Sequence, residues 1–415
     1  MYLENAWSIK IYKVLFYEFK KFIMKKFLNL GLQPLANSYI IKKNLKLKEK
    51  KFQLIVGFNT KNYLVSILNT VPKEQMFNED YPYKSSESKT MQKSFRELAK
   101  KLKNKYKPKF IIEIGSNDGA FIKNFNRSNV VGVEPCKNLA LITKKKKYQT
   151  YSEYWTPNLS KKITKYKKAD LIYSANTLSH IQNLNQIFKA IEDALSDKGV
   201  LVLEDPSLLE CLKNVAYDQF YCEHIYVFSA IALKKILSKY GLEIFDIENT
   251  KTHGGSNRYY IKRRSNNFYK IQQSVKREIK KEIIFGLNKL STYMKFAAKV
   301  KKSKLQLIKI FQELKRKKQK IIGYGATAKS CTVLNYCGIG NNFIDYFYDT
   351  TSFKKNKYLP GSKIKIKSYK KLDRNKIDIV YLGAWNFKRE IFKKEKSFIK
   401  KGGRFITHIP YPKII

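Results

Sequence analysis

One stretch, residues 110–140 (FIIEIGSNDGAFIKNFNRSNVVGVEPCKNLA), constrains the fold of this chain more than any other. Residues 110–114 and 130–133 are short apolar runs rich in β-branched side chains, a composition typical of buried strands. Between them lie the loop 115–119 and a short segment with helical character. Strand, loop, helix and strand in this order predict the start of a nucleotide-binding unit in a parallel sheet.

The acids of this stretch indicate the kind of ligand. A dinucleotide fingerprint requires glycine where Asn117 stands. Glu113 precedes Gly115 by two residues and can face a cation, and Glu134 can accept hydrogen bonds from both hydroxyls of a ribose. S-adenosylmethionine carries both groups, and we predict that it binds here; the alternative is an ordinary sheet turn with surface acids. The predicted cofactor residues are Glu113, Gly115, Asn117, Asp118, Gly119, Glu134, Pro135 and Asn176.

The net charge of the chain is +51 over 415 residues, which is typical of proteins with nucleic-acid partners. Ten of the 84 basic residues are Arg, however, and the Lys residues are spread through the whole chain. A nucleic-acid reader concentrates Arg at base edges and phosphates. We therefore attribute the excess to lysine-rich codon usage and expect no specific nucleic-acid partner.

The cysteines and apolar runs bear on the compartment. Five Cys, the first of them Cys136, form no regular disulfide framework, so we expect a reducing cytoplasm. No apolar run approaches the roughly 18 residues of a membrane-spanning helix. Lys10, Lys13 and Lys20 interrupt any signal-peptide core, so we expect no such leader.

We expect three parts in an α/β chain. Residues 1–80 combine an aromatic, basic segment with a small domain, residues 81–265 carry the methyltransferase-type unit, and residues 266–415 hold helical connectors and a second α/β unit. The elements predicted for the middle part are strands over 169–175 and 199–204, a helix over 178–194, and an antiparallel pair over 241–252 and 257–262.

The second α/β unit begins with a strand over residues 320–324 and a loop in which Gly323, Gly325 and Lys329 resemble a phosphate cradle. Tight packing of strand on helix explains these glycines equally well. A nicotinamide-binding module is a further alternative, although no acid stands convincingly at the expected distance.

Segments spread over residues 30–412 resemble the three-domain sugar C-methyltransferases of nucleotide-deoxysugar biosynthesis. The matching segments are LGLQPLANSY, YPYKSSESKTM, EIGSNDGAF, GVEP, ANTLSHI, YDQFYCEH, YVFS, HGGSNRYY, GYGATAKS, DYFYDTT, KYLPGSKI, AWNF and HIPYP. Each is weak alone, and together in one order they are specific. The resemblance implies a Rossmann-like class I methyltransferase core, a small N-terminal domain and a second Rossmann-like C-terminal domain.

The resemblance also implies a mechanism, in which a proton is removed from the carbon next to the ketone of a nucleotide-linked 4-keto-deoxysugar. His224 is then the base, with Glu223 assisting it, because neutral His suits proton abstraction near pH 7. The tyrosines expected to hydrogen-bond the enolate oxygen are Tyr81, Tyr83 and Tyr221. The residues expected to bind the substrate are His180, His253, Gly254, Arg258 and Lys329. This chemistry requires no metal.

Two departures from the family stand out. Its N-terminal domain usually carries four zinc-binding cysteines, whereas no Cys precedes Cys136 here, so we expect no metal site. Cys222 also stands before Glu223 where a polar residue is expected, which leaves the substrate open. Two alternatives remain: an RNA- or tRNA-directed methyltransferase, and an inactive family member that serves as a scaffold.

Overall fold

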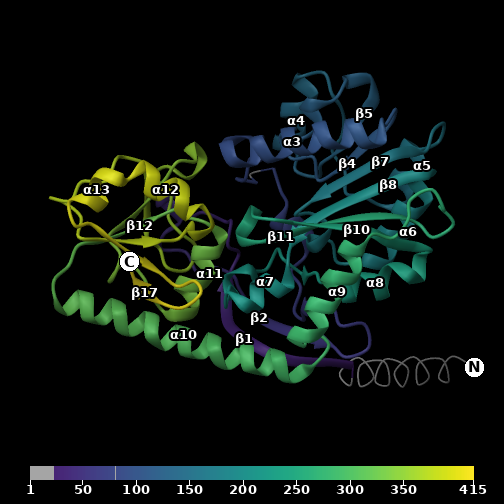
Figure 1. The fold of residues 1–415 in the computed structure, drawn as a ribbon. Helices are drawn as coiled ribbons and strands as arrows, with labels where there is room; N and C mark the ends of the chain where they lie inside the picture. The colour runs from purple at the N-terminus through teal and green to yellow at the C-terminus, as the bar shows by residue number, and fades with distance from the viewer. Residues whose placement is uncertain (1–22, 80) are drawn as a thin grey trace, which may run out of the picture.

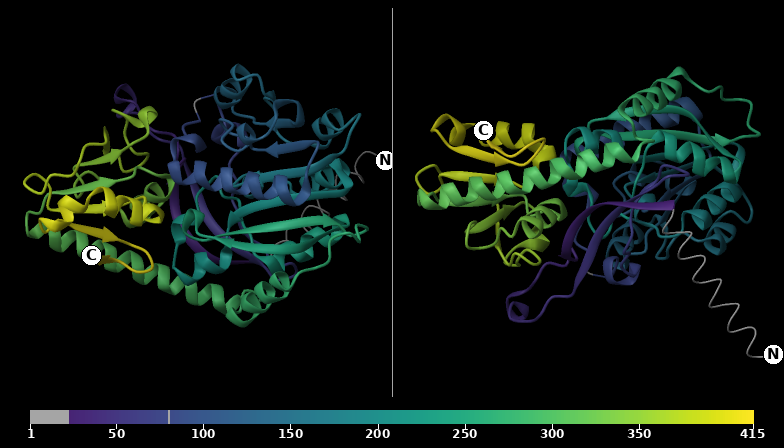
Figure 2. Two further views of the ribbon diagram at one scale, coloured as in Figure 1. Left: turned by 45° about the horizontal axis from the view of Figure 1, so that its top comes forward. Right: turned by 90° about the horizontal axis from the view of Figure 1, so that it is seen from below.

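The computed structural model of the chain describes residues 23–79 and 81–415, which form three β-sheets (Figure 1). The aromatic, basic segment expected at the start of residues 1–80 lies largely outside the described residues. The two larger sheets lie at opposite ends of the molecule, and the long helix α10 (Leu290–Arg316) runs between them along one side (Figures 1 and 2).

The largest sheet has seven strands in the order β10-β11-β8-β7-β4-β5-β6. Strand β11 runs antiparallel to both of its neighbours, and all the others run in one direction. The strands are β4 (Ile111–Ile114), β5 (Val130–Val133), β6 (Gln149–Tyr151), β7 (Ala169–Ala175), β8 (Leu195–Pro206), β10 (Leu242–Thr250) and β11 (Ser256–Arg263). The order reverses between β4 and β7, and doubly wound sheets bind ligands at the carboxyl ends of the strands at such a switch point.

Helices pack against this sheet because its central parallel strands are apolar on both faces; every residue of β4 and β5 is buried. They are α3 (Lys89–Tyr106), α4 (Lys137–Lys145), α5 (Pro157–Ile163), α6 (Leu184–Ala194) and α8 (Ala230–Leu237). The short helix α7 (Leu208–Lys213) follows β8 and packs into a different core. The helix predicted over 178–194 is divided into a 3-10 turn, Leu178–His180, and α6. The Asn183 side chain caps α6 by accepting from the Gln186 amide, so the helix begins there. The segment after Gly119 is likewise a 3-10 turn, Ile122–Asn124.

The second α/β layer has six strands in the order β14-β13-β12-β15-β16-β17. They are β12 (Ile321–Tyr324), β13 (Tyr346–Asp349), β14 (Lys365–Ser368), β15 (Ile379–Leu382), β16 (Arg404–Thr407) and β17 (Lys413–Ile414). Its helices are α11 (Ala328–Cys337), α12 (Lys388–Lys394) and α13 (Lys396–Lys400). The short strands β14 and β17 were not predicted, because each is polar and exposed along most of its length.

The small third sheet is antiparallel, in the order β1-β2-β3-β9, and a short helix, α2 (Lys73–Met76), follows it. Three strands come from the N-terminal part: β1 (Met24–Pro34), β2 (Lys51–Asn59) and β3 (Val65–Ile67). The fourth, β9 (Tyr226–Val227), comes from the middle of the chain and begins two residues after His224. The N-terminal sheet is therefore joined to the segment that carries the predicted base.

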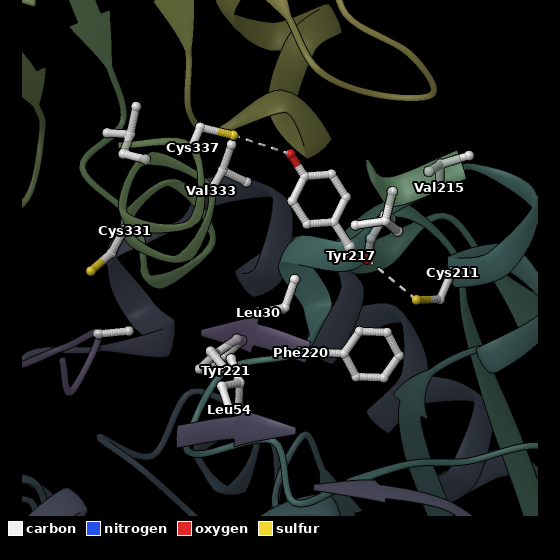
Figure 3. Packing of buried hydrophobic residues seen from close by; sticks show 14 of the residues in the cluster. Leu30, Leu54, Cys211, Val215, Tyr217, Phe220, Tyr221, Cys331, Val333 and Cys337 are labelled. Carbon is white, nitrogen blue, oxygen red and sulfur yellow. Dashed lines mark hydrogen bonds between the residues drawn. The ribbon is translucent and has the colours of Figure 1, made fainter. Parts of the chain in front are cut away.

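Two helices, α9 (Gln273–Phe285) and α10, connect the larger sheets as predicted. One hydrophobic core includes β1 and β2, the inner face of α10, residues 208–221 and α11. In close view, Tyr217 lies beside the α11 residues Val333 and Cys337, and Phe220 lies near the strand residues Leu30 and Leu54 (Figure 3). Among the described residues, no helix is both long enough and apolar enough to span a bilayer.

Candidate active site

The loop after β4 has the backbone that its glycines allow. Gly115 and Gly119 have φ angles of +77° and +83°, and Asn117 has φ of 52°. A Cβ atom on Gly115 would lie 2.1 Å from the Thr177 hydroxyl, so only glycine lets this loop pass the end of β7. The loop is thereby held at the switch point of the sheet.

Two buried acids face each other beside the loop. Burial and the nearby Glu134 raise the pKa of Glu113 well above its usual range, and its Oε2 atom has no partner among the described residues. Glu134 is 5% exposed and accepts from the amides of Asn117 and Cys136, at 2.8 Å each. Burial raises the pKa of Glu134 as well. An uncompensated pair of buried carboxyls is the setting in which a bound cation is stabilising.

Other polar atoms around this loop also lack partners within residues 23–79 and 81–415. They are Ser116 Oγ, Asn138 Oδ1 and Trp155 Nε1. Buried polar groups in proteins are nearly always hydrogen-bonded, so unpaired ones mark a place for a ligand. A cation for Glu113, hydroxyls for Glu134 and further polar atoms nearby fit S-adenosylmethionine. Pro135 follows Glu134 directly and fixes φ at the start of the next loop.

Two of the predicted cofactor residues use their side chains differently. Asn117 accepts from the Ser85 amide at 2.9 Å and donates to the Tyr83 carbonyl at 3.1 Å. Asp118 accepts from the amide and the hydroxyl of Ser86. Residues 83–86, here named the cover segment, are therefore held over the loop by Asn117 and Asp118, and the YPYKSS motif is attached to the cofactor loop.

The predicted base lies in a buried segment after α7. The Tyr221 hydroxyl is hydrogen-bonded to His224 Nε2, and the two rings lie 4.0 Å apart. Burial, followed by the nearby His180, Lys329 and His253, lowers the pKa of His224 well below its usual value, so the ring is neutral. Burial raises the pKa of Tyr221 well above 10, so its hydroxyl donates to the imidazole.

Glu223 lies beside His224 in sequence but is directed elsewhere. Its Oε1 accepts from Asn37 at 2.7 Å and its Oε2 from the Tyr81 hydroxyl at 3.1 Å. Burial raises the pKa of Glu223 to about 7, against the two hydrogen bonds. Glu223 was expected to assist His224 either by orienting its ring or by holding its charge; the orienting role is corrected here, because the hydrogen bond to the ring comes from Tyr221.

The remaining histidines complete the cluster. His180 stacks between Phe77 and His224, with ring centroids 5.5 Å and 5.0 Å away, and its Nε2 is unpaired among the described residues. Burial lowers the pKa of His180 to about 4. His253 Nε2 lies 3.3 Å from the Asn176 amide, which joins the glycine turn to the end of β7. The adjacent Gly254 packs on Trp385, where a Cβ atom would lie 2.3 Å from the indole.

Lys329 and Arg258 differ in how far their charges are already paired. The Lys329 ammonium lies 6.0 Å from the centroid of the Tyr221 ring and acts electrostatically on His224 and His253. Arg258 forms an ion pair of 2.6 Å with the buried Glu204 and also donates to Ser94. The structure therefore brings Lys329 to the cluster and gives Arg258 a structural partner.

In the glycine loop of the second α/β unit, the polar groups are already hydrogen-bonded to other groups of the protein. Asp349, at the end of β13, accepts from the amides of Ala326 and Thr351 at 2.8 Å and from Lys354 at 3.2 Å. Thr327 and Ser330 form a capping box at the start of α11, and Tyr39 donates to the Ala326 carbonyl. The positions that a nicotinamide or phosphate group would use are thus occupied, which argues against that alternative.

A cleft between the two α/β units is bordered by one histidine of the cluster, His253. Its two parts have volumes of about 340 and 670 Å³ and share a wall made by Thr90, residues 249–251, Asn386 and Phe387. The smaller part is lined by His253 and Arg258, and the larger by Trp385 and Gly254. The cleft is wide enough for a substrate of nucleotide size.

Sequence reasoning missed several residues that contact the site from distant parts of the chain. Asn37 reaches Glu223 from the N-terminal part, and Trp385 and His408 reach Asp218 from the C-terminal part. All lie inside segments that carry the resemblance, LANSY, AWNF and HIPYP, which was the available signal. Among the described residues, no group of three or more His, Cys, Asp or Glu is placed to hold a metal.

The strand order of the largest sheet, with β11 as its antiparallel member, and the acid-lined loop after β4 define a class I methyltransferase that uses S-adenosylmethionine. Residues 83–247 match the family model of a methyltransferase domain, and residues 251–410 match that of a C-methyltransferase C-terminal domain. Together the two models span most of the chain, which therefore resembles C-methyltransferases that join these two domains.

One curated relative is the C-methyltransferase NovU of Streptomyces niveus, which is 28% identical over 93% of this chain and 93% of its own. Solved structures that match include an S-adenosylmethionine-dependent methyltransferase from Clostridium acetobutylicum, at 14% identity, 41% of this chain, 91% of that chain and a TM-score of 0.32. Magnesium protoporphyrin IX methyltransferase from Synechocystis with bound S-adenosylmethionine matches at 13% identity, 41% of this chain, 79% of its own and a TM-score of 0.32.

Proposed function

We propose that this C-methyltransferase methylates the carbon next to the ketone of a nucleotide-linked 4-keto-deoxysugar. The observation that carries the proposal is the hydrogen-bonded pair of Tyr221 and neutral His224, buried close to the cofactor loop. A carbon acid next to a ketone needs a neutral base and a donor for the enolate oxygen, and this cluster offers both. The relative NovU is a C-methyltransferase, which agrees with transfer to carbon.

The proton leaves the substrate carbon and ends on His224. Because the Tyr221 hydroxyl donates to Nε2, two routes are compatible with the geometry. Either the hydroxyl turns away and Nε2 takes the proton directly, or Tyr221 takes it while passing its own proton to Nε2. In both routes the C–H electron pair moves into the enolate, and His224 becomes an imidazolium that later returns its proton to solvent.

The negative charge that develops on the ketone oxygen needs donors and a cation. Tyr81 and Tyr83 keep their protons at neutral pH, because burial raises the pKa of Tyr81 well above 10 and that of Tyr83 to about 12. Lys329 adds a positive charge from the second α/β unit. When bound, S-adenosylmethionine supplies an electrophilic methyl group to the carbon.

The other assigned residues position these groups. Glu223 and Asn37 hold Tyr81, and Asn117 and Asp118 hold the cover segment that includes Tyr83. We assign His180, His253 and Gly254 to the walls of the sugar site, and we assign Glu113 and Glu134 to the cofactor. We also assign Arg258 to the substrate site, where its charge is already paired with Glu204. All five cysteines are free thiols, and we place the reaction in a reducing cytoplasm.

The test uses the full chain with methyl-labelled cofactor and a panel of nucleotide-linked 4-ketosugars and 4-hydroxysugars. Mass spectrometry should find one added methyl group on a ketosugar and none on its hydroxyl counterpart. Label on tRNA but on no sugar would move the RNA-directed alternative to first place. Label on no acceptor of either class would favour the scaffold alternative.

A second measurement separates proton removal from methyl transfer. Deuterium wash-in at the substrate carbon is followed with an inert cofactor analogue bound. His224→Ala should lose about 100-fold or more in both wash-in and methylation, with cofactor affinity retained. Tyr221→Phe should retain wash-in if His224 takes the proton directly and should lose it if Tyr221 relays it. Wash-in at the parental rate in His224→Ala would remove His224 as the base.

A further inference from the structure

One buried acid of the catalytic segment has its partners in the second α/β unit. Asp218 lies in the 3-10 turn Tyr217–Gln219, three residues before Tyr221, and its side chain is fully buried. Its Oδ2 accepts from the Trp385 indole at 2.5 Å and from His408 Nε2 at 3.1 Å. The Tyr381 hydroxyl is bonded to the other nitrogen of His408, at 3.2 Å. Three residues of the C-terminal unit thus fix one carboxylate of the middle unit.

The carboxylate is ionised in this setting. Burial acts to raise the pKa of Asp218, but the hydrogen bond and charge of His408, the charge of Lys329 and the Trp385 donor outweigh it, and the pKa is lowered. Oδ1 has no hydrogen-bond partner among the described residues. A buried carboxylate with one oxygen that accepts no hydrogen bond destabilises the folded state unless a nearby cation balances its charge.

Lys329 is the cation that stands opposite. It lies in the first turn of α11, which packs against the turn that carries Asp218, and Tyr217 of that turn extends to Cys337 of the same helix (Figure 3). A Lys at a helix N-terminus is opposed by the helix dipole. Burial also lowers the pKa of Lys329, while Asp218 and then Cys211 raise it. Within the described part of the chain Lys329 forms no direct ion pair, and Asp218 is the first acid that acts on its charge.

We propose that Asp218 is a positioning residue for the methyl transfer: fixed by Trp385 and His408 in the turn that packs against α11, it supplies the negative charge that stabilises the Lys329 ammonium beside Tyr221. The C-terminal unit thereby contributes to catalysis through Trp385 and His408, and not through its glycine loop. This inference rests on the proposed function, because its kcat/KM measurements need the ketosugar substrate. The groups that face Lys329 from the packed elements are Asp218, Cys211, Tyr221, His224 and His253.

The first test is the ionisation of Lys329 itself, which needs no substrate. Competitive acetylation over a pH series, read by peptide mass spectrometry, gives the apparent pKa of Lys329 in the full chain. Asp218→Asn should lower this pKa by about one unit, because one nearby anion is removed. Trp385→Phe removes one of the two donors to Asp218 and should give a smaller shift in the same direction. An unchanged Lys329 pKa in a folded Asp218→Asn protein would overturn the proposal.

The second test is a double-mutant cycle on kcat/KM. Asp218→Asn should cost about tenfold or more in the parent and less than about twofold in a Lys329→Met background, since the residues act as a unit. The alkaline limb of the pH profile should move to lower pH in Asp218→Asn and stay in place when position 329 is Arg, which does not lose its charge. Equal losses in both backgrounds would mean that Asp218 serves stability alone.

The controls separate this inference from the proposed function. Asp378→Asn alters an acid of the same unit that pairs with Arg374 at 2.6 Å, and it should leave kcat/KM and the Lys329 pKa unchanged. If no ketosugar is methylated by the parent, the proposed function fails while the Lys329 titration still decides the inference. If methylation occurs and the titration shows no coupling, the inference alone fails.

Discussion

Both α/β units place a glycine-containing loop after their first strand, but the acids beside the two loops are paired differently. In the first, the loop after β4 lies beside Glu113, whose Oε2 is unpaired in the described structure, and beside Glu134, which is held by backbone amides. In the second, Asp349 occupies the matching place after β13 and is saturated by two amides and Lys354. A glycine loop next to an acid therefore does not define a ligand site; the unmet hydrogen bonds and charge around it do.

The comparison also indicates what the second unit adds to the site. Its loop is closed, but Lys329, two residues into the helix after that loop, extends toward Tyr221. The first unit offers a cofactor site and the second offers a charge. Substitutions at matching positions should therefore separate cofactor affinity from stability.

The largest effect is expected from Asp349→Ala, which removes the partner of a buried cation. Burial opposes the charge of Lys354, but Asp349 and Tyr39 outweigh it and raise the pKa of that Lys. Loss of the acid leaves the ammonium uncompensated and should cost about 3 kcal/mol in the free energy of unfolding by urea. Cofactor affinity by calorimetry should be unchanged.

The control for this substitution is Asp373→Ala, an exposed acid of the same unit whose partner Lys376 is 3.9 Å away. It should change the free energy of unfolding by less than about 0.5 kcal/mol. If Asp349→Ala instead weakened cofactor binding, the second loop would be a ligand site after all.

The opposite result is expected at the matching acid of the first unit. Glu134→Gln keeps the size of the side chain but removes the charge and one acceptor, so the ribose and the loop amides lose a strong acceptor. The Kd for S-adenosylmethionine should rise about 30-fold, which corresponds to about 2 kcal/mol. Asp349→Asn is the matched control and should bind as the parent does. Parental affinity in Glu134→Gln would mean that another residue binds the ribose.

The sequence predicted the strands of both units because parallel strands are apolar on both faces, as in β4 and β12. It predicted the motif that contains Tyr221, Glu223 and His224 as the site. It did not predict which of these side chains pair. Glu223 turns to Asn37, which is 186 residues away, and that choice depends on how the N-terminal sheet packs. Local patterns do not encode such contacts.

A pH effect should distinguish the first unit, where the histidine cluster lies. Burial lowers the pKa of His180 to about 4, whereas the unfolded value is 6.5. At pH 7.5 both states are neutral and the residue contributes nothing. As the pH falls below 6.5, the unfolded chain binds a proton that the folded chain does not, so stability is lost, by about 2 kcal/mol at pH 5.

Buried acids act in the opposite direction over part of this window: burial raises the pKa of Asp205 to about 8 and of Glu223 and Glu282 to about 7, and it raises those of Glu113 and Glu134 as well. The informative quantity is therefore the difference between the parent and His180→Phe, which preserves the stack on Phe77. This difference should shift in favour of the variant by about 2 kcal/mol between pH 7.5 and pH 5. A difference that is independent of pH would mean that His180 is protonated in the folded chain.

The smallest effect on cofactor affinity is expected from a substitution in the cover segment of the first unit. The second loop is closed by buried groups, while the first is closed by the cover segment, which Asp118 holds through the amide and hydroxyl of Ser86. Ser86→Ala removes the hydroxyl bond and leaves the amide bond. A hydrogen bond to a carboxylate that water can replace is worth about 1 kcal/mol or less, so the Kd for the cofactor should rise about threefold.

The position of the effect is as informative as its size. Amide hydrogen exchange should increase over residues 83–87 in Ser86→Ala and stay at the parental rate in α11, because the cover segment opens locally while the core is unchanged. Ser88→Ala is a useful comparison, since Ser88 caps α3 by accepting from the Met91 amide. It should destabilise the start of α3 and leave cofactor affinity alone. Equal effects of the two substitutions on the Kd would mean that α3, and not the hydrogen bonding of Ser86 to Asp118, controls access to the first loop.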